Sequence, residues 1–148
     1  MSGIAPATAS TAVLLDTCAL IWLANGDPLH DDGDEKIIRA ALGEGVFVSP
    51  ISAWEIGMLS RPKPGRVIAF LPDPATWFAR FSAGPGIRTA AFTAEIAIAA
   101  SQLPEPLHGD PADRLLIATA RSLTLPIVTR DAKILAYAAA GHVSAIPC

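Results

Sequence analysis

The stretch AVLLDTCALIWLA (residues 12–24) predicts how this domain is built. Residues 12–15 form a short aliphatic run, which is typical of a parallel strand buried on both faces. Asp16 ends the run, and residues 17–24 have the apolar spacing of a helix. A strand, an acidic residue and a helix in direct succession indicate an α/β domain with a carboxylate at its first turn.

The same alternation continues along the chain. Capping residues and apolar periodicity predict where several helices start. Ser52 and Glu55 fit a capping box, which predicts that Ser52 caps the helix over residues 52–59. Further strands are predicted at residues 46–48, 87–91, 127–129 and 143–146, and helices at residues 34–43, 52–59, 75–81, 93–103, 112–123 and 131–139. This order favours a single α/β domain over residues 12–148 with a parallel sheet, preceded by a loose arm at residues 1–11.

Composition limits the functional classes. The chain has 148 residues, of which 51% are hydrophobic and 17% charged, so one domain with a sizeable core is expected. The net charge of −3 counts against a basic nucleic-acid binder, although a bound cation restores positive charge locally at an acidic site. Cys18 and Cys148 form no metal-binding motif. Without a visible leader or membrane span, a cytoplasmic protein that does not contact membranes is expected.

Acidic residues recur where the predicted strands end. Asp16 and Asp131 each follow a strand, Glu55 lies early in the helix after the second strand, and Asp113 opens a helix after a proline-rich loop, three residues beyond Asp110. In open α/β sheets, ligands bind beyond the carboxyl ends of the strands, where these side chains can converge. Clustered carboxylates repel one another, and Mg²⁺ or Mn²⁺ relieves that repulsion while activating water against a phosphodiester.

Each acidic residue also has an explanation without catalysis. Asp16, Asp110 and Asp131 can cap the helices that follow them, and Glu55 can be the capping-box partner of Ser52. Taken one residue at a time, capping and metal binding both remain open. The shared edge of the sheet is what favours a metal site.

Four segments in order resemble the signature segments of PIN-domain ribonucleases, in particular the VapC-like toxins of toxin–antitoxin pairs. They are LLDTCALIWLA (14–24), SPISAWEI (49–56), HGDPADRLLIATA (108–120) and VTRD (128–131). The resemblance spans nearly the whole chain. It implies a three-layer α/β/α sandwich with a short, mainly parallel sheet, and Mg²⁺- or Mn²⁺-dependent cleavage of RNA.

The resemblance also implies roles for single residues. Asp16, Glu55, Asp113 and Asp131 match the four family carboxylates that carry catalysis and metal binding, and Asp110 matches a frequent secondary acid. Thr129 matches a position where a small hydroxyl residue often supports the site. Thr17 is expected either to orient Asp16 or simply to start the helix that follows. Arg114, Arg130 and Lys133 are candidates for phosphate contacts, with surface charge or ion pairing as the alternative. The chain departs from the family at Cys18, where this branch commonly has histidine.

The remaining aromatic and imidazole residues are assigned to other roles. The three tryptophans Trp22, Trp54 and Trp77 are expected in the core, and stacking on bases is the alternative. The three histidines are expected to be solvated, and only His108 lies near a site residue.

The resemblance implies two protein partners, a cognate antitoxin and a second copy of the chain in a homodimer. Apolar stretches at residues 19–23 and 58–59 are expected to offer a surface for an antitoxin helix. One alternative is a catalytically inactive PIN-like binding domain, against which the four retained carboxylates argue. A phosphatase of the haloacid dehalogenase type is a weaker alternative, because it requires a second aspartate where Cys18 stands.

Overall fold

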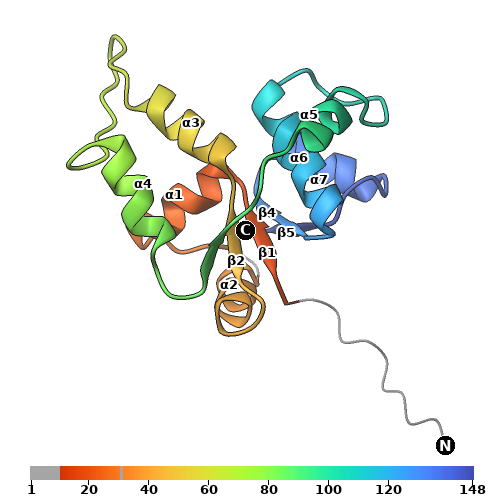
Figure 1. Ribbon diagram of the computed structural model, residues 1–148, viewed down its shortest axis with the longest axis horizontal. Coiled ribbons are helices and arrows are strands. Elements are labelled where there is room, and N and C mark those ends of the chain that lie inside the picture. Colours follow the sequence, from red (N-terminus) through yellow and green to blue (C-terminus); the bar gives the residue numbers. More distant parts are fainter. Residues whose placement is uncertain (1–10, 31) are drawn as a thin grey trace, which may run out of the picture.

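The computed structural model describes residues 11–30 and 32–148, so the predicted arm lies almost wholly outside the described residues. The described residues form five strands and seven helices (Figure 1). The strands are β1 (Val13–Leu15), β2 (Val46–Val48), β3 (Ile87–Thr89), β4 (Ile127–Thr129) and β5 (Ala145–Pro147). The helices are α1 (Thr17–Asn25), α2 (Gly33–Leu42), α3 (Pro50–Leu59), α4 (Pro74–Ser82), α5 (Ala94–Ser101), α6 (Pro111–Leu123) and α7 (Ala132–Ala139).

The five strands make one sheet in the order β3-β2-β1-β4-β5. Every pairing between neighbouring strands is parallel, with Val13 opposite Val46 on one side of β1 and Leu15 opposite Val128 on the other. The chain first moves outward from β1 through β2 to β3 and then returns to place β4 on the other side of β1. The strand order therefore reverses between β1 and β4, which is the point where α/β sheets bind their ligands.

Successive residues of the strands point to opposite faces of the sheet, and each face carries its own core. Leu14 and Ile127 pack with α5, α6 and α7, whereas Val13, Leu15 and Val128 pack with α1, α2 and α3. Figure 1 shows α1, α3 and α4 on one side of the sheet and α5, α6 and α7 on the other. This confirms the predicted three-layer α/β/α sandwich with a short parallel sheet.

Several boundaries differ from the sequence-based expectations, and one difference matters for the site. The predicted cap Ser52 is wrong, because α3 begins at Pro50 and Ser49 accepts the Ile51 backbone N–H at 3.0 Å. Proline suits the first position of a helix, since its missing N–H has no partner there in any case. Ser52 is thereby moved from the helix end into the first turn, where it is fully buried.

Smaller differences concern the ends of other elements. The second helix begins at Gly33, one residue before the predicted start, and Asp32 precedes it. The last strand covers Ala145–Pro147, later than predicted, because residues 140–143 form the turn that follows α7. Within the described residues, every helix is too short or too polar to cross a bilayer.

Candidate active site

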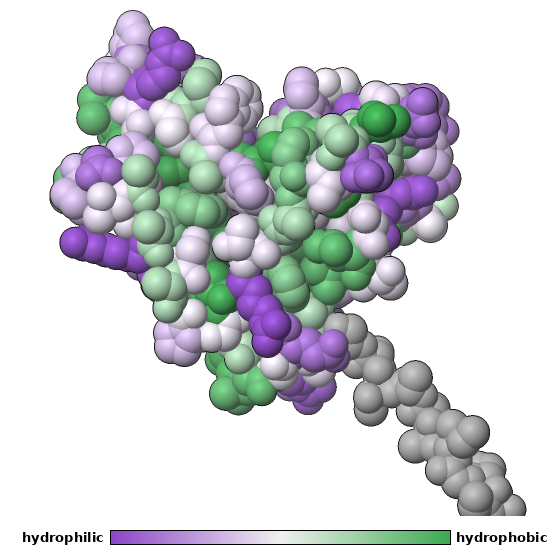
Figure 2. All heavy atoms as spheres, in the orientation of Figure 1, coloured by the Kyte–Doolittle hydropathy of each residue, from purple (hydrophilic) through white to green (hydrophobic). Residues whose placement is uncertain are grey.

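The four core carboxylates line one cavity of about 250 Å³ beyond the carboxyl ends of β1 and β4. Asp16 directly follows β1, Asp131 follows β4 by two residues, Glu55 lies in α3 and Asp113 in the first turn of α6. The space-filling view shows the surface indented between the lobe that carries α3 and the lobe that carries α5 and α6 (Figure 2). The full lining comprises Asp16, Thr17, Cys18, Trp22, Glu55, Asp113, Arg130 and Asp131.

Three of the acidic residues at the site also cap the helices that follow them. Asp16 Oδ1 accepts the Ala19 N–H at 2.7 Å, and Asp131 Oδ1 accepts the N–H groups of Lys133 and Ile134 at 2.8 and 3.1 Å. Asp110 caps α6 in the same way, through the Asp113 N–H at 3.2 Å. Because each cap uses one carboxylate oxygen in these contacts, the same side chain can still present the other oxygen to a cation. Helix starts also stabilise negative charge.

Glu55 has no capping role. Its carboxylate accepts a short hydrogen bond from the Thr17 hydroxyl, which in turn lies 2.9 Å from the buried Ser52 hydroxyl. The expectation that Thr17 orients Asp16 is thus corrected, because its side chain contacts Glu55 instead. Sequence reasoning missed Ser52 as a site residue. The Ser49-Pro50 pair was the available signal, since a cap followed by proline at the first position places Ser52 and Glu55 on one helix face.

Burial raises the pKa of three of these carboxyl groups. The pKa of Asp16 rises from 3.8 to about 6 because the group is desolvated, with further increases from the charges of Asp131 and Glu55. Desolvation also raises the pKa of Asp113 to about 7, and the charge of the neighbouring Asp110 is the next largest cause. The pKa of Glu55 rises through burial, partly offset by the Thr17 hydrogen bond. Ionising these carboxyl groups together is therefore unfavourable, and a bound cation would stabilise their charged forms.

Thr129 lies between two of the carboxylates. Its side chain is fully buried, its Oγ1 accepts the Asp131 N–H at 3.0 Å, and its hydrogen bond to the Asp16 side chain lowers the pKa of that group. The last residue of β4 thus joins the ends of the two strands that flank the switch point. This placement agrees with the supporting role expected for Thr129.

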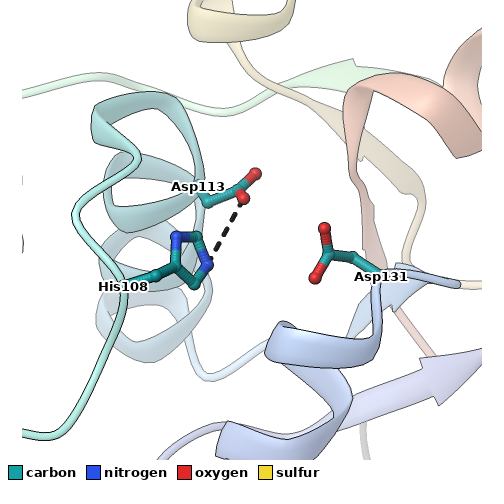
Figure 3. A group of neighbouring side chains, drawn as sticks. All are labelled: His108, Asp113 and Asp131. Carbon is teal, nitrogen blue, oxygen red and sulfur yellow. Dashed lines mark ion pairs between the residues drawn. The ribbon is translucent and has the colours of Figure 1, made fainter.

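His108 belongs to the site more closely than expected. It lies in the loop before α6, with its side chain only 16% exposed, and its Nε2 is 3.5 Å from Asp113 Oδ2. Figure 3 shows His108 and Asp113 side by side, with Asp131 facing them from the start of α7. One ligand atom from each of these residues lies within 4.8 Å of the others. The expectation of a solvated histidine is wrong here, because the loop folds back against α6.

The three candidate phosphate contacts occupy different places. Arg130 lines the cavity, where its guanidinium carbon lies 3.4 Å from the ring centroid of Trp22 and its Nε donates to the Cys148 carbonyl at 3.1 Å. Arg114 is not among the cavity-lining residues, and its Nε donates to the Ala100 carbonyl at 3.1 Å. Lys133 is exposed on α7. Of the three, only Arg130 carries its charge into the cavity.

Two further residues line the cavity: Trp22, which was expected in the core and is only half-buried, and Cys18. Trp22 supports the Arg130 guanidinium with its ring face, a favourable cation–π arrangement. Cys18 stands among the acids, and burial together with the negative charge of Asp16 raises the pKa of its thiol to about 11. A thiol with so high a pKa is protonated at neutral pH, whereas nucleophilic attack requires the thiolate.

The donor set fits a hard divalent cation. The groups that converge are carboxylates from four different elements, and oxygen ligands are those that Mg²⁺ and Mn²⁺ prefer. A larger hollow of about 940 Å³ lies between α6, α7 and β5, but no acidic residue lines it. Among the described residues, the cavity at the switch point is thus where metal chemistry fits.

Comparisons with known proteins agree with this fold. The family model of the PIN domain matches residues 13–140. The chain is 31% identical over 125 residues to ribonuclease VapC22 of Mycobacterium tuberculosis, covering 84% of this chain and 90% of that protein.

Solved structures are similar at lower identity. The VapBC2 structure from Rickettsia felis, bound to a promoter DNA fragment, aligns with a TM-score of 0.64 and 14% identity over 92% of this chain and 98% of that one. The VapBC-5 structure from Mycobacterium tuberculosis aligns with a TM-score of 0.58 and 20% identity over 93% and 99%. With the family model spanning nearly the whole described domain, the chain belongs to the PIN-domain family.

Proposed function

We propose that this protein is a metal-dependent endoribonuclease that acts as the toxin of a toxin–antitoxin pair. The observation that carries the proposal is the convergence of Asp16, Glu55, Asp113 and Asp131 on one cavity at the switch point of the sheet. The similarity to a protein named ribonuclease VapC22 supports RNA as the substrate.

The four carboxylates would hold one or two ions of Mg²⁺ or Mn²⁺. A bound ion supplies Lewis acidity, which activates water and stabilises negative charge on the phosphate. Asp110 is a secondary acid: it is exposed, caps α6, and its charge raises the pKa of both Asp113 and Glu55. The residues around the acids then determine how rigidly the carboxylates are presented.

The other polar residues of the cavity have separable tasks. Thr17 and Ser52 fix the Glu55 carboxylate, and Thr129 fixes the spacing between Asp16 and Asp131. Arg130 offers a guanidinium to an RNA phosphate beside the acids, and Trp22 holds that guanidinium in place. Lys133 offers a second, exposed positive charge at the start of α7.

An antitoxin and a second copy of the chain are the proposed partners. The VapBC-5 structure supports the antitoxin, since that protein is described as a member of a family of toxin–antitoxin systems. Of the apolar residues expected to be exposed on α1, Ala19 and Leu20 are fully buried, whereas residues 21–23 are half-buried. The outer face of α3 is a better candidate, with Trp54 60% and Met58 41% exposed, which also corrects the expectation of a core position for Trp54.

The test of the nuclease is RNA cleavage in Mg²⁺ or Mn²⁺ by the wild type, Asp16→Asn and Asp113→Asn. Asp27→Asn, an exposed acid outside the cavity, is the matched control. The proposal expects cleavage by the wild type and the control, its loss in both site variants, and its loss after chelation. Equal cleavage by all four proteins would show that the activity comes from elsewhere. If only the site variants lose cleavage, sequencing the cut ends would define the target RNA.

A partner test runs in parallel. Co-expression with the neighbouring open reading frame and size-exclusion chromatography with light scattering would measure assembly. A stable complex containing two toxin chains is expected. A monomer that binds no partner would contradict the toxin–antitoxin role and leave the nuclease site to be judged by cleavage alone.

A further inference from the structure

The imidazole of His108 is placed among the carboxylates with one nitrogen unused. Its Nε2 atom is buried and makes no hydrogen bond, although Asp113 Oδ2 lies 3.5 Å away. A buried nitrogen without a partner requires an explanation. Two are available: Nε2 is a metal ligand together with Asp113 and Asp131, or Nε2 carries a proton directed at Asp113.

The other ring nitrogen decides between these explanations. The backbone N–H of Asp110 donates to His108 Nδ1 at 3.3 Å. A nitrogen that accepts a hydrogen bond has its lone pair free, so in the neutral ring the proton sits on Nε2. A metal-ligating histidine has the opposite pattern, since its second nitrogen donates to a carboxylate, carbonyl or water. The hydrogen bond from Asp110 therefore makes Nε2 a donor and not a ligand.

The loop holds the ring in this orientation through several contacts. The Arg114 guanidinium, only 14% exposed, reaches the Ala100 carbonyl at 3.1 Å, the Glu105 carboxylate at 3.4 Å and the His108 carbonyl at 3.5 Å. The Tyr137 hydroxyl donates to the Pro104 carbonyl at 2.7 Å. Arg114 thus connects the end of α5, the loop and the first turn of α6, which fixes the backbone on which His108 is mounted.

We propose that His108 is a positioning residue, whose Nε2–H group orients the Asp113 carboxylate toward the cavity while His108 itself stays outside the metal ligands. Arg114 serves the same end by anchoring the loop, which gives it a role other than gripping phosphate. This inference rests on the proposed metal-dependent function. Distances within the group His108, Asp113 and Asp131 would by themselves suggest that His108 Nε2 is a metal ligand. The inference instead makes Nε2 a hydrogen-bond donor to the Asp113 carboxylate.

Mn²⁺ binding tests the inference without relying on activity. Wild type is compared with His108→Gln, which keeps an N–H donor at similar reach, and with His108→Leu, which has none. His30→Gln, an exposed histidine outside the cavity, is the control. We expect the Mn²⁺ dissociation constant to rise about 10-fold in His108→Leu and to stay within about 3-fold of wild type in His108→Gln, as for partners that orient a ligand. The control remains unchanged.

Pulsed electron paramagnetic resonance of the Mn²⁺-loaded wild type provides a second measurement, independent of how the variants fold. We expect no coupling from a directly bound histidine nitrogen. Such a coupling, abolished in His108→Gln, would overturn the inference and make His108 a ligand. Equal Mn²⁺ affinity in wild type, His108→Gln and His108→Leu would overturn it as well, by showing that the imidazole has no effect on the site.

Asp113→Asn separates this inference from the proposed function. If Asp113→Asn loses Mn²⁺ while His108→Leu binds it normally, the metal site stands and only the positioning role fails. If the wild type does not bind Mn²⁺ at all, the proposed function fails and the inference fails with it.

Discussion

The two walls of the cavity are both acidic but are built differently. We call Asp16, Thr17, Glu55 and Asp131, with Ser52 behind Thr17, the sheet wall, and Asp113, with His108 and Asp110 beside it, the loop wall. On the sheet wall, Asp16 and Thr17 are 6% exposed and Ser52 is fully buried, and all lie beside the hydrophobic core. On the loop wall, the Asp113 side chain is 21% exposed and Asp110 is open to solvent. In the sheet wall, strand ends position the aspartates, and α1 and α3 position Thr17, Ser52 and Glu55. Hydrogen bonds between side chains and loop backbone position the loop wall.

This difference predicts that the sheet wall tolerates less change than the loop wall. A buried carboxylate at a strand end cannot move, and no water molecule can take its place as a metal ligand. An exposed acid can be substituted by water or by a neighbour. The following predictions compare the two walls, beginning with the largest effect.

Asp16→Asn is expected to reduce RNA cleavage by roughly 1,000-fold or more, about 4 kcal/mol of activation free energy, because it removes a buried anionic ligand. Asparagine keeps the helix cap, so the fold is retained. Asp110→Asn on the loop wall is expected to reduce cleavage by less than about 10-fold. Single-turnover cleavage rates in Mn²⁺ measure both. Losses of equal size would show that the walls do not differ in this respect.

The pH dependence of stability should reveal the charge held by both walls. Folding raises the pKa of Asp16 from 3.8 to about 6 and that of Asp113 to about 7. The folded state thus binds more protons than the unfolded state between pH 4 and 7, and stability falls as pH rises through that window. The loss for Asp16 alone is about 3 kcal/mol, since one pKa unit corresponds to about 1.4 kcal/mol.

Thermal unfolding in a chelator from pH 5 to pH 8 measures this loss. The melting temperature is expected to fall with rising pH by roughly 5–10 °C, and saturating Mn²⁺ should flatten the curve. Asp113→Asn should reduce the slope, whereas the exposed Asp27→Asn should not. If the melting temperature without metal stays constant over this range or rises with pH, the pKa values of Asp16 and Asp113 are not raised by folding.

Thr17→Val tests the hydrogen-bonded network of the sheet wall. Valine keeps the shape of threonine but removes the hydroxyl that contacts Glu55 and Ser52. Cleavage is expected to fall about 10-fold, or about 1.4 kcal/mol, because Glu55 loses its fixed orientation. Thr17→Ser retains the hydroxyl and should cleave at nearly the wild-type rate. The same rate in both variants would show that packing, and not the hydroxyl, matters at this position.

Arg114→Met gives the smallest expected catalytic effect, because it acts on the loop wall only through the backbone. Cleavage should fall about 3-fold, or about 0.7 kcal/mol. The control is Arg121→Met on the same helix, whose guanidinium donates to the His142 carbonyl at 2.6 Å, away from the cavity. Arg121→Met should leave the cleavage rate unchanged. A similar fall in the cleavage rate of both variants would contradict a specific role for Arg114.

The sheet wall was also the more predictable wall. Aliphatic runs ending in Asp16 and Asp131 give both the strand and the position of the acid, because strand ends in a parallel sheet share one edge. Glu55 was predicted for the right cavity but with the wrong local contact. The helix start was placed at Ser52, two residues late, and burial of the Ser52 hydroxyl depends on α1 packing beside α3, which no local pattern encodes.

The loop wall could be predicted only in part. Asp113 followed from its place at the start of a helix, but the orientation of His108 depends on a proline-rich loop folding back on α6. The bonds that fix this loop come from Arg114 and Tyr137, up to 33 residues away from their partners. Contacts at such separation have no signature in spacing or composition. The same reason explains why Arg130 on Trp22 was not foreseen.

Three of the acids at this site, Asp16, Asp110 and Asp131, also begin helices through one carboxylate oxygen. Asparagine can perform that structural task equally well, and one base change converts an aspartate codon into an asparagine codon. A gene of this kind can therefore lose its cutting activity in one mutational step and still produce a protein of the same shape. Such inactive variants would still bind the antitoxin, and in the laboratory they can be used to isolate it without toxicity.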